Sequence, residues 1–364
     1  MRAAILRDPS RPLEIADCAL SDPHPGEVRV KLRATGVCHS DANFVDGSKP
    51  YPLPVILGHE GAGVVTTVGD GTRSVRPGDH VVLAMTPSCG YCRACLHGNG
   101  AVCPNVPHRS AGAMPDGTRR LSCDGEDIHH FVWLSTFAEE VVVPETVCVP
   151  IRSDAPLDKL AVLACGATTG VMSAFSAGIR LGDAVAVFGC GGVGLAIVIG
   201  AALSGAREII AIDPVADKVQ AAREVGATIG IVAPADEATT EVRERTGGGA
   251  EVVFEATGRL DVMNSVLSCC AEGGTTMIVG VATSATAALT IPYAWLRRNR
   301  RLLGSHFGAA EIRRDIPDLV ELYMSGRLPI DVMISTTRPL GEINDAFTDM
   351  HRGSATRTVI DFEL

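Results

Sequence analysis

Short apolar segments separated by turn residues fill the first part of this 364-residue chain. In GEVRVKLRATG (26–36) and GAGVVTTVGDGTRSVRPGDHVVLA (61–84), apolar and polar positions alternate, and Gly or Pro interrupts the runs. A period of two is typical of strands that bury one face. The pattern predicts a β-rich, barrel-like domain over residues 1–166.

A different pattern begins at residue 167, where strand-like apolar runs alternate with helix-like segments. The runs include VAVFG, EIIAID, EVVFEATG and TTMIVG, and ADKVQAAREVGA is typical of a helix between two of them. This alternation predicts an α/β domain with a doubly wound parallel sheet over residues 167–306. Residues 184–206 carry no charge and could span a bilayer by length. Their cluster of glycines instead favours a buried strand, a turn and a buried helix.

Composition narrows the class of protein. Apolar residues make up 46% of the chain and charged residues 20%, which excludes a disordered chain. The formal net charge of -10 argues against a nucleic-acid partner. The start, MRAAILRDPSRPLEI, has charges and prolines where a signal peptide needs an apolar core. We therefore expect a cytoplasmic protein with neither a membrane nor a nucleic acid as partner.

A glycine motif follows the first strand of the second domain. Its members are Gly189, Gly191, Gly192, Val193 and Gly194, in the order G-x-G-x-x-G. Such glycines permit a tight turn and let the backbone approach a pyrophosphate at a helix N-terminus. Asp213 ends the next strand, 19 residues beyond Gly194, and can accept hydrogen bonds from ribose hydroxyls. Its charge would repel a 2′-phosphate, so the motif favours NAD over NADP. The alternative for Asp213 is an ordinary carboxylate at the end of a strand.

Four cysteines lie within fifteen residues, at Cys89, Cys92, Cys95 and Cys103. Four thiolates at about 2.3 Å from one ion make a closed tetrahedral zinc site, which has no open position and is therefore structural. The alternatives are a pair of disulfides or four unrelated thiols. The reducing environment that the remaining, unpaired cysteines indicate argues against disulfides.

A second metal site can be assembled from three separated motifs. Cys38 lies in GVCHSD, His59 in GHEGAG with Glu60 beside it, and Cys165 in LACGATTG. Two thiolates and one imidazole leave a fourth tetrahedral position for water or an alcohol. Taken singly, each residue could be an ordinary buried or surface side chain. Their joint occurrence with the four-cysteine lobe and the glycine motif predicts a catalytic zinc.

With these motifs in place, the chain resembles the zinc-containing medium-chain alcohol dehydrogenases over nearly its whole length. The resemblance also rests on EATGRLDVM, IVGV and TRTVIDF. It implies a GroES-like catalytic domain, a Rossmann domain that binds NAD, two zinc ions per subunit, an active site in the cleft between the domains, and a tail (307–364) that returns to the catalytic domain. The long stretch from Cys103 to Phe137 is similar to that of dimeric members, so a homodimer is expected.

The resemblance also assigns individual residues. Ser40 is expected to touch the substrate oxygen and the nicotinamide ribose, Asp41 to hydrogen-bond the zinc-bound histidine, and Glu60 to lie behind the metal. The expected contacts with NAD are His39 and Arg357 at the pyrophosphate, Lys218 with Asp213 at the ribose, Arg259 by the adenine, Thr169 and Val193 at the nicotinamide, and Val281. The expected lining of the substrate pocket is Met85, Phe131 and His306.

The implied activity is reversible NAD-dependent oxidation of a primary alcohol, aromatic or medium-chain, to the aldehyde. Zinc would act as a Lewis acid on the hydroxyl, Ser40 would pass the proton towards the ribose, and the nicotinamide would take the hydride. Asn43 is a departure, because horse-liver-type members carry a histidine there as the outer end of a proton relay. An amide does not titrate near neutral pH, so the route of proton release stays open.

Two other functions fit the same motifs. A thiol-adduct-dependent formaldehyde dehydrogenase uses the same fold and zinc. Its glutathione-dependent members hold the carboxylate of the adduct with an arginine in the long loop, where this chain has Pro107 with Arg109 nearby. The second alternative is a non-catalytic redox sensor that binds NAD and zinc. The intact set of catalytic ligands argues against a sensor.

Overall fold

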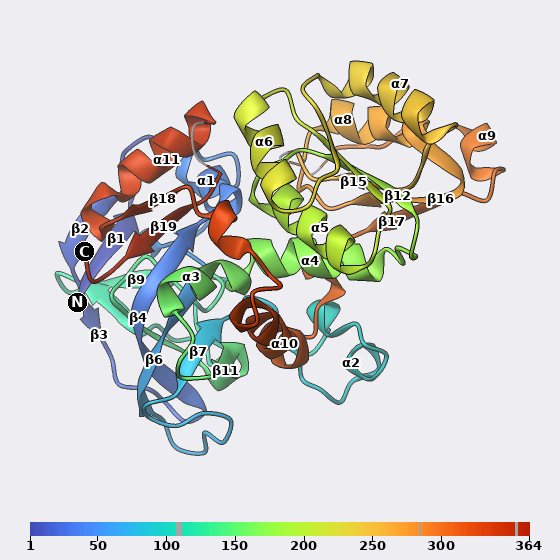
Figure 1. Cartoon of the computed structure of the whole chain (residues 1–364). Coiled ribbons are helices and arrows are strands. Elements are labelled where there is room, and N and C mark those ends of the chain that lie inside the picture. Colours follow the sequence, from blue (N-terminus) through green and yellow to red (C-terminus); the bar gives the residue numbers. More distant parts are fainter. Residues whose placement is uncertain (107–110, 283, 285, 354–355) are drawn as a thin grey trace. The chain divides into compact units, whose positions relative to one another are not determined.

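The computed structural model describes the whole chain apart from residues 107–110, 283, 285 and 354–355. It divides into two compact units, one formed by Met1–Cys165 with Glu311–Leu364 and the other by Gly166–Ala310 (Figure 1). The chain thus leaves the first unit after Cys165 and returns to it at Glu311.

The first unit is built mainly of strands in two sheets. One sheet has the order β2-β1-β5-β9-β8-β3, and the other has the order β11-β7-β6-β4-β19-β18, with β10 also pairing with β4. The strands are β1 (Arg2–Leu6), β2 (Glu14–Asp17), β3 (Ala19–Leu20), β4 (Glu27–Val37), β5 (Val55–Ile56), β6 (Glu60–Val68), β7 (His80–Leu83), β8 (Leu121–Cys123), β9 (Glu126–His130), β10 (Glu140–Pro144), β11 (Cys148–Ile151), β18 (Thr336–Arg338) and β19 (Thr358–Asp361).

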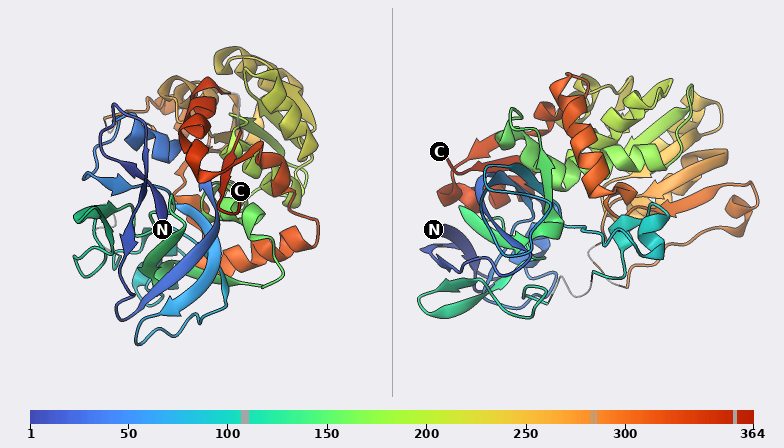
Figure 2. Two further views of the ribbon diagram at one scale, coloured as in Figure 1. Left: turned by 90° about the vertical axis from the view of Figure 1, so that its left-hand side faces the viewer. Right: turned by 90° about the horizontal axis from the view of Figure 1, so that it is seen from below.

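Helices in this unit are short except near the C-terminus. They are α1 (His39–Val45), α2 (Arg93–Leu96), α3 (Leu157–Leu160), α10 (Ile312–Met324) and α11 (Ile343–Arg352), with 3-10 turns η1 (Gly100–Val102), η2 (Glu145–Val147), η3 (Ala161–Ala164), η6 (Ile330–Met333) and η7 (Leu340–Glu342). The tail completes the larger sheet, because β19 pairs antiparallel with β4 through Thr358 and Val37. Figure 2 shows the red C-terminal strands beside the blue strand β4 from two further directions.

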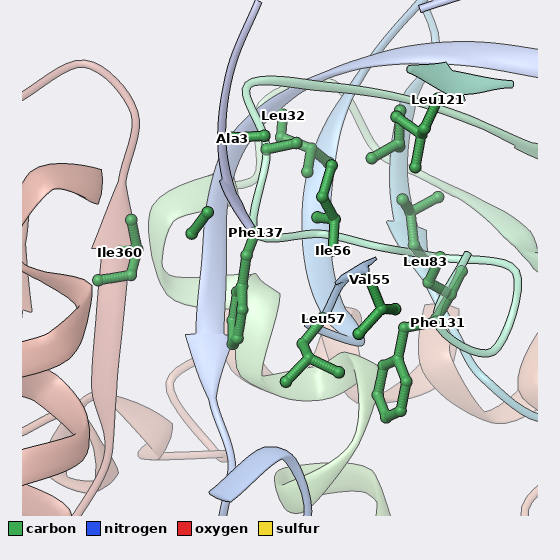
Figure 3. Packing of buried hydrophobic residues seen from close by; sticks show 14 of the residues in the cluster. Ala3, Leu32, Val55, Ile56, Leu57, Leu83, Leu121, Phe131, Phe137 and Ile360 are labelled. Carbon is green, nitrogen blue, oxygen red and sulfur yellow. The ribbon is translucent and has the colours of Figure 1, made fainter. Parts of the chain in front are cut away.

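One apolar core holds the two sheets of the first unit together. Figure 3 shows Val55 and Leu57 next to Phe131, and it also labels Phe137 and Ile360 of the same cluster. These side chains are at most 3% exposed. The alternation seen along 26–36 is real: β4 buries most of its residues while Lys31 stays exposed.

The second unit is a parallel sheet with helices on both faces. The strand order is β14-β13-β12-β15-β16-β17, and every pairing is parallel. Helices α4 and α5 cover one face, and α7 and α8 lie on the other (Figure 1). The elements are α4 (Gly166–Ser176), β12 (Ala184–Phe188), α5 (Gly192–Leu203), β13 (Glu208–Ile212), α6 (Ala216–Glu224), β14 (Ile229–Ile231), α7 (Ala235–Thr246), β15 (Ala250–Glu255), α8 (Leu260–Ser265), η4 (Val266–Cys269), β16 (Cys270–Ile278), α9 (Tyr293–Leu296), β17 (Arg301–Gly304) and η5 (Phe307–Ala309).

The uncharged stretch 184–206 is the buried strand β12, a glycine turn and helix α5, as the glycine cluster indicates. Within the described part of the chain, no single helix is long and apolar enough to cross a membrane. One bent pair, Leu157–Ala164 with Gly166–Ser176, passes that test of length and composition. The prediction of a β-rich domain combined with a doubly wound parallel sheet is confirmed.

Candidate active site and metal centres

Three distant segments of the first unit meet at one buried cluster. Cys38 caps the start of α1 directly after β4, His59 stands just before β6, and Cys165 follows η3. Strands β4 and β6 pair antiparallel with Gly36 opposite Glu60, and this register brings Cys38 and His59 together. The ligand atoms of Cys38, His59, Glu60 and Cys165 all lie within 4.8 Å of one another.

Polar neighbours orient the histidine and the first thiol. The Asp41 carboxylate lies 2.9 Å from His59 Nδ1 and accepts a hydrogen bond from the Cys38 backbone N–H. With Nδ1 held in this way, Nε2 is the atom that can bind a metal. The Ser40 hydroxyl lies 3.1 Å from Cys38 Sγ and 3.2 Å from His59 Nε2. It therefore stands directly beside the predicted ligand atoms.

The pKa values of the two thiols in the cluster are shifted in opposite directions. A hydrogen bond with Cys165, together with the charge of Arg357, lowers the pKa of Cys38 well below its ordinary value although burial opposes this. The same hydrogen bond and burial raise the pKa of Cys165. One thiol is thus easily ionised while the other holds its proton, and metal ligation requires both to be ionised. Although burial lowers the pKa of His59, the Asp41 carboxylate raises it well above 6.5.

An ion pair buried behind the cluster connects the tail to β6. Arg357 is 5% exposed, and its Nη1 donates to Glu60 Oε1 at 2.9 Å and to the Val37 carbonyl. Burial raises the pKa of Glu60 to about 7 despite the arginine. Glu60 Oε2 has no hydrogen-bond partner among the described residues. The predicted contact of Arg357 with a pyrophosphate stays a prediction.

The donor set of this cluster fits zinc. Two sulfurs and one imidazole nitrogen are the ligands that zinc prefers, and three protein ligands leave an open position. Two thiolates also balance the charge of a divalent ion, so a buried site carries no uncompensated charge.

The four-cysteine lobe fits zinc by its distances. Cys92 Sγ lies 3.4 Å from Cys95 Sγ and 3.8 Å from Cys103 Sγ, and the Cys89 and Cys95 sulfurs are 3.9 Å apart. Four sulfurs about 2.3 Å from one centre stand about 3.8 Å apart. All twelve cysteines are free thiols, so the disulfide alternative does not hold.

The glycine motif forms the turn between β12 and α5. Gly189 has φ +95°, which favours glycine, and a Cβ at Gly194 would overlap the Gly189 carbonyl. The Asp213 carboxylate accepts hydrogen bonds from Cys190 N and from Val215 N, both at 2.9 Å. Asp213 thus also anchors the glycine turn, a role that sequence reasoning missed. An open helix N-terminus beside an acidic strand end fits a dinucleotide.

The other predicted cofactor contacts are distributed over both units. Thr169 lies in α4, Val193 in α5, Lys218 in α6, Arg259 before α8 and Val281 after β16, and His39 begins α1 of the first unit. Arg259 pairs with Asp261 at 2.7 Å, and Val281 is 65% exposed. Their contacts with NAD stay predictions.

Of the predicted pocket residues, Phe131 packs beside one of the metal ligands. Its ring centroid stands 6.0 Å from that of His59, and it packs edge-on against Phe44 and Tyr51. Sequence reasoning missed Phe44, although its position four residues after Ser40 on α1 places it on the same helix face. Met85 is half-buried near this core, whereas His306 belongs to the second unit. Pro107 and Arg109 lie outside the described residues.

The fold and the two cysteine clusters define a zinc-dependent oxidoreductase that uses a nicotinamide dinucleotide. Two family models match, the alcohol dehydrogenase GroES-like domain over residues 24–153 and the zinc-binding dehydrogenase over 192–325. The chain belongs to the zinc-containing medium-chain alcohol dehydrogenase family.

Named relatives cover almost the whole chain. It is 40% identical to the alcohol dehydrogenase class-3 of Dictyostelium discoideum over an alignment of 369 positions, which covers 99% of this chain and 97% of the relative. It is 41% identical to the S-(hydroxymethyl)glutathione dehydrogenase of Saccharomyces cerevisiae over an alignment of 368 positions, which covers 98% of this chain and 95% of the relative. Benzyl alcohol dehydrogenase from Acinetobacter calcoaceticus has a similar structure, with a TM-score of 0.93 and 30% identity over 99% of this chain and 98% of that one.

These findings correct the predicted substrate. Oxidation of a primary aromatic or medium-chain alcohol is the wrong prediction, because the relatives at 40–41% identity are a class-3 enzyme and S-(hydroxymethyl)glutathione dehydrogenases. The resemblance led to that error because the same zinc and NAD machinery serves both substrates. The family consists of enzymes, so the redox-sensor alternative is set aside. The predictions of a zinc- and NAD-dependent enzyme are confirmed.

Proposed function

We propose that this chain oxidises the adduct of formaldehyde with a small thiol, with NAD as the electron acceptor and S-(hydroxymethyl)glutathione as the leading substrate. The identity of 40–41% with enzymes of that name and of class 3 carries the proposal. The reaction converts R–S–CH2–OH and NAD⁺ into R–S–CHO, NADH and a proton. The substrate is chemically an alcohol, and three protein ligands would leave one coordination position of the zinc open for its hydroxyl.

The residues of the first unit have separate tasks in this reaction. Cys38, His59 and Cys165 would hold the zinc ion, whose chemistry is to lower the pKa of a bound hydroxyl. Asp41 keeps His59 oriented. Ser40, beside two of the ligand atoms, can accept the proton of the substrate hydroxyl and pass it on. The buried ring of Phe131 packs edge-on beside His59 and can shield the site on that side.

The test compares NADH formation with formaldehyde alone, the thiol alone and both together. We expect turnover only when formaldehyde and the thiol are combined, and a rate that follows the concentration of the adduct. Glutathione and other carboxylate-bearing thiols should be compared, because this chain has Pro107 where glutathione-dependent members carry an arginine. An equal rate with formaldehyde alone would contradict the thiol-adduct proposal.

We also propose that the enzyme is a cytoplasmic homodimer. The long stretch between Cys103 and Phe137 supports the dimer by similarity to dimeric members, and twelve cysteines without a disulfide support a reducing compartment. Light scattering on purified protein should give twice the 38.0 kDa mass of the chain. A mass of one or four chains would contradict the dimer.

A further inference from the structure

A buried carboxylate ends the central strand β15 of the second unit. Glu255 is 0% exposed, and β15 lies between β12 and β16 in the sheet. Ligands of doubly wound sheets bind outside the carboxyl ends of the strands, which is where Glu255 stands. A buried carboxylate is costly unless it is hydrogen-bonded, so its partners indicate why it is there.

The first partner is the turn that follows β15. Glu255 Oε1 accepts hydrogen bonds from Thr257 N at 2.6 Å, from Gly258 N at 3.0 Å and from the Thr257 hydroxyl. These hydrogen bonds lower the pKa of the carboxyl, but burial outweighs them and raises it. Three donors from one turn converge on a single oxygen, so the carboxylate holds that turn in one shape. Arg259 ends this turn as the N-cap residue of α8.

The second partner is the turn that follows β16. The Glu255 carbonyl accepts hydrogen bonds from Val279 N at 2.9 Å and Gly280 N at 3.0 Å. The carboxylate faces the same glycine, because a Cβ on Gly280 would lie 2.6 Å from Glu255 Oε2. A Cβ on Gly258 would lie 2.6 Å from the Val281 carbonyl. The two turns therefore touch through their glycines, and Glu255 contacts both.

We propose that Glu255 is a positioning residue for NAD. It holds the turns 256–259 and 279–281 together at the carboxyl edge of the sheet, in the shape that receives the cofactor. The inference concerns how the second unit binds NAD and does not depend on which alcohol is oxidised. Failure of the thiol-adduct proposal would leave it untouched.

The strand itself supplies a matched control. Glu251 lies on the same strand at its amino end, where Oε2 accepts a hydrogen bond from Ala184 N at 2.8 Å. Glu255→Gln and Glu251→Gln remove the same charge from opposite ends of β15. Only the first of these changes touches the turns at the carboxyl edge.

The measurements are the Kd of NAD for the substrate-free holoenzyme and hydrogen exchange of the NAD-free protein. We expect Glu255→Gln to raise Kd by roughly tenfold, because hydrogen bonds to a charged acceptor are strong. Exchange should become faster within 256–259 and 279–281, whereas Glu251→Gln should keep Kd within about twofold. An unchanged Kd in Glu255→Gln would overturn the proposal, as would an equal loss in Glu251→Gln or a wild type that does not bind NAD.

Thr257→Val is a second variant that tests the same proposal if Glu255→Gln does not fold. It removes the hydroxyl donor from the turn and leaves the buried carboxylate in place. We expect Kd for NAD to rise about threefold to fivefold, since one neutral donor is lost. A Kd equal to that of the wild type would then overturn the proposal.

Discussion

The two cysteine clusters of the first unit are built in opposite ways. The lobe takes its four ligands from Cys89–Cys103, and three of them are only half-buried. The catalytic cluster takes Cys38, His59 and Cys165 from segments separated by 21 and 106 residues, and His59 is 1% exposed. Short turns alone can shape the lobe, whereas the catalytic cluster exists only when β4, β6 and η3 have come together.

The surroundings of the clusters differ as well. Four thiolates around a divalent ion carry two net negative charges, which a site near solvent tolerates. Two thiolates neutralise the ion, which suits a buried site. Around the lobe the neighbours are backbone N–H groups and the exposed amide of Asn105. Around the catalytic cluster they are the buried charges of Asp41, Glu60 and Arg357. The comparison indicates that the lobe stabilises the fold and that the catalytic cluster serves the reaction.

The largest effect should come from Cys38→Ser. We expect turnover to fall by roughly a thousandfold, because the change removes a ligand from the zinc that acts as Lewis acid. Thermal unfolding should shift little, since β4 and β6 keep their pairing. Metal analysis and steady-state kinetics check both expectations. Substantial activity with only the lobe zinc bound would contradict the role given to the cluster.

Cys92→Ser should have the reverse effect, with a loss of stability and little loss of turnover. We expect loss of one zinc per subunit and a fall in Tm of roughly 5–10 °C, because metal binding is coupled to folding of the lobe. Turnover per catalytic zinc should stay within about threefold of the wild type at low temperature. Calorimetry with metal analysis measures this. If the variant kept the wild-type Tm, the structural role of the lobe would be wrong.

Substitutions of residues next to the ligands test the difference between the two sites. Asp41→Asn removes the charge that orients His59, and we expect metal affinity or turnover to fall by about tenfold to a hundredfold. Asn105→Ala removes the donor to Cys89 Sγ, 3.4 Å away at the surface, and should change lobe zinc affinity by less than about threefold. Competition with a zinc chelator measures both. Equal effects would show that burial does not distinguish the two sites.

The smallest effect concerns two buried histidines of the first unit. The Asp41 carboxylate raises the pKa of His59, whereas burial and the charges of Arg120 and Arg119 lower the pKa of His130 to about 3. The unfolded chain binds a proton at His130 below pH 6.5 and the folded chain does not, so stability falls as pH falls from 6.5 towards 3.

His130→Gln keeps an acceptor for the Arg120 backbone N–H, which lies 2.9 Å from His130 Nε2, but does not titrate. The stability of the wild type relative to this variant should therefore drop by about 1 kcal/mol between pH 7 and 5.5. Urea unfolding of both proteins at the two pH values measures the difference. A difference that does not change with pH would show that His130 binds a proton as readily in the folded chain as in the unfolded chain.

Much of the fold and of the metal sites can be predicted from the sequence, because the sequence patterns that indicate them are local. The alternation along β4, the runs of β12 and β13, the glycine turn and the spacing of the lobe cysteines each lie within a few tens of residues. What sequence reasoning missed involves distant contacts or fine substrate differences. Phe44 and Tyr51 reach Phe131 only in the folded unit, and the substrate was corrected by whole-chain relatives rather than by any single motif.

The sequence by itself determined the fold class, the residue types of both metal sites and NAD as the cofactor, because periodicity and spacing depend on neighbours along the chain. The tertiary structure decided which side chains meet. The register of β4 against β6 places Cys38 beside His59, the returning tail brings Arg357 to Glu60, and Glu255 touches two turns that follow different strands. Such contacts come from strand pairing and burial, which no local pattern specifies.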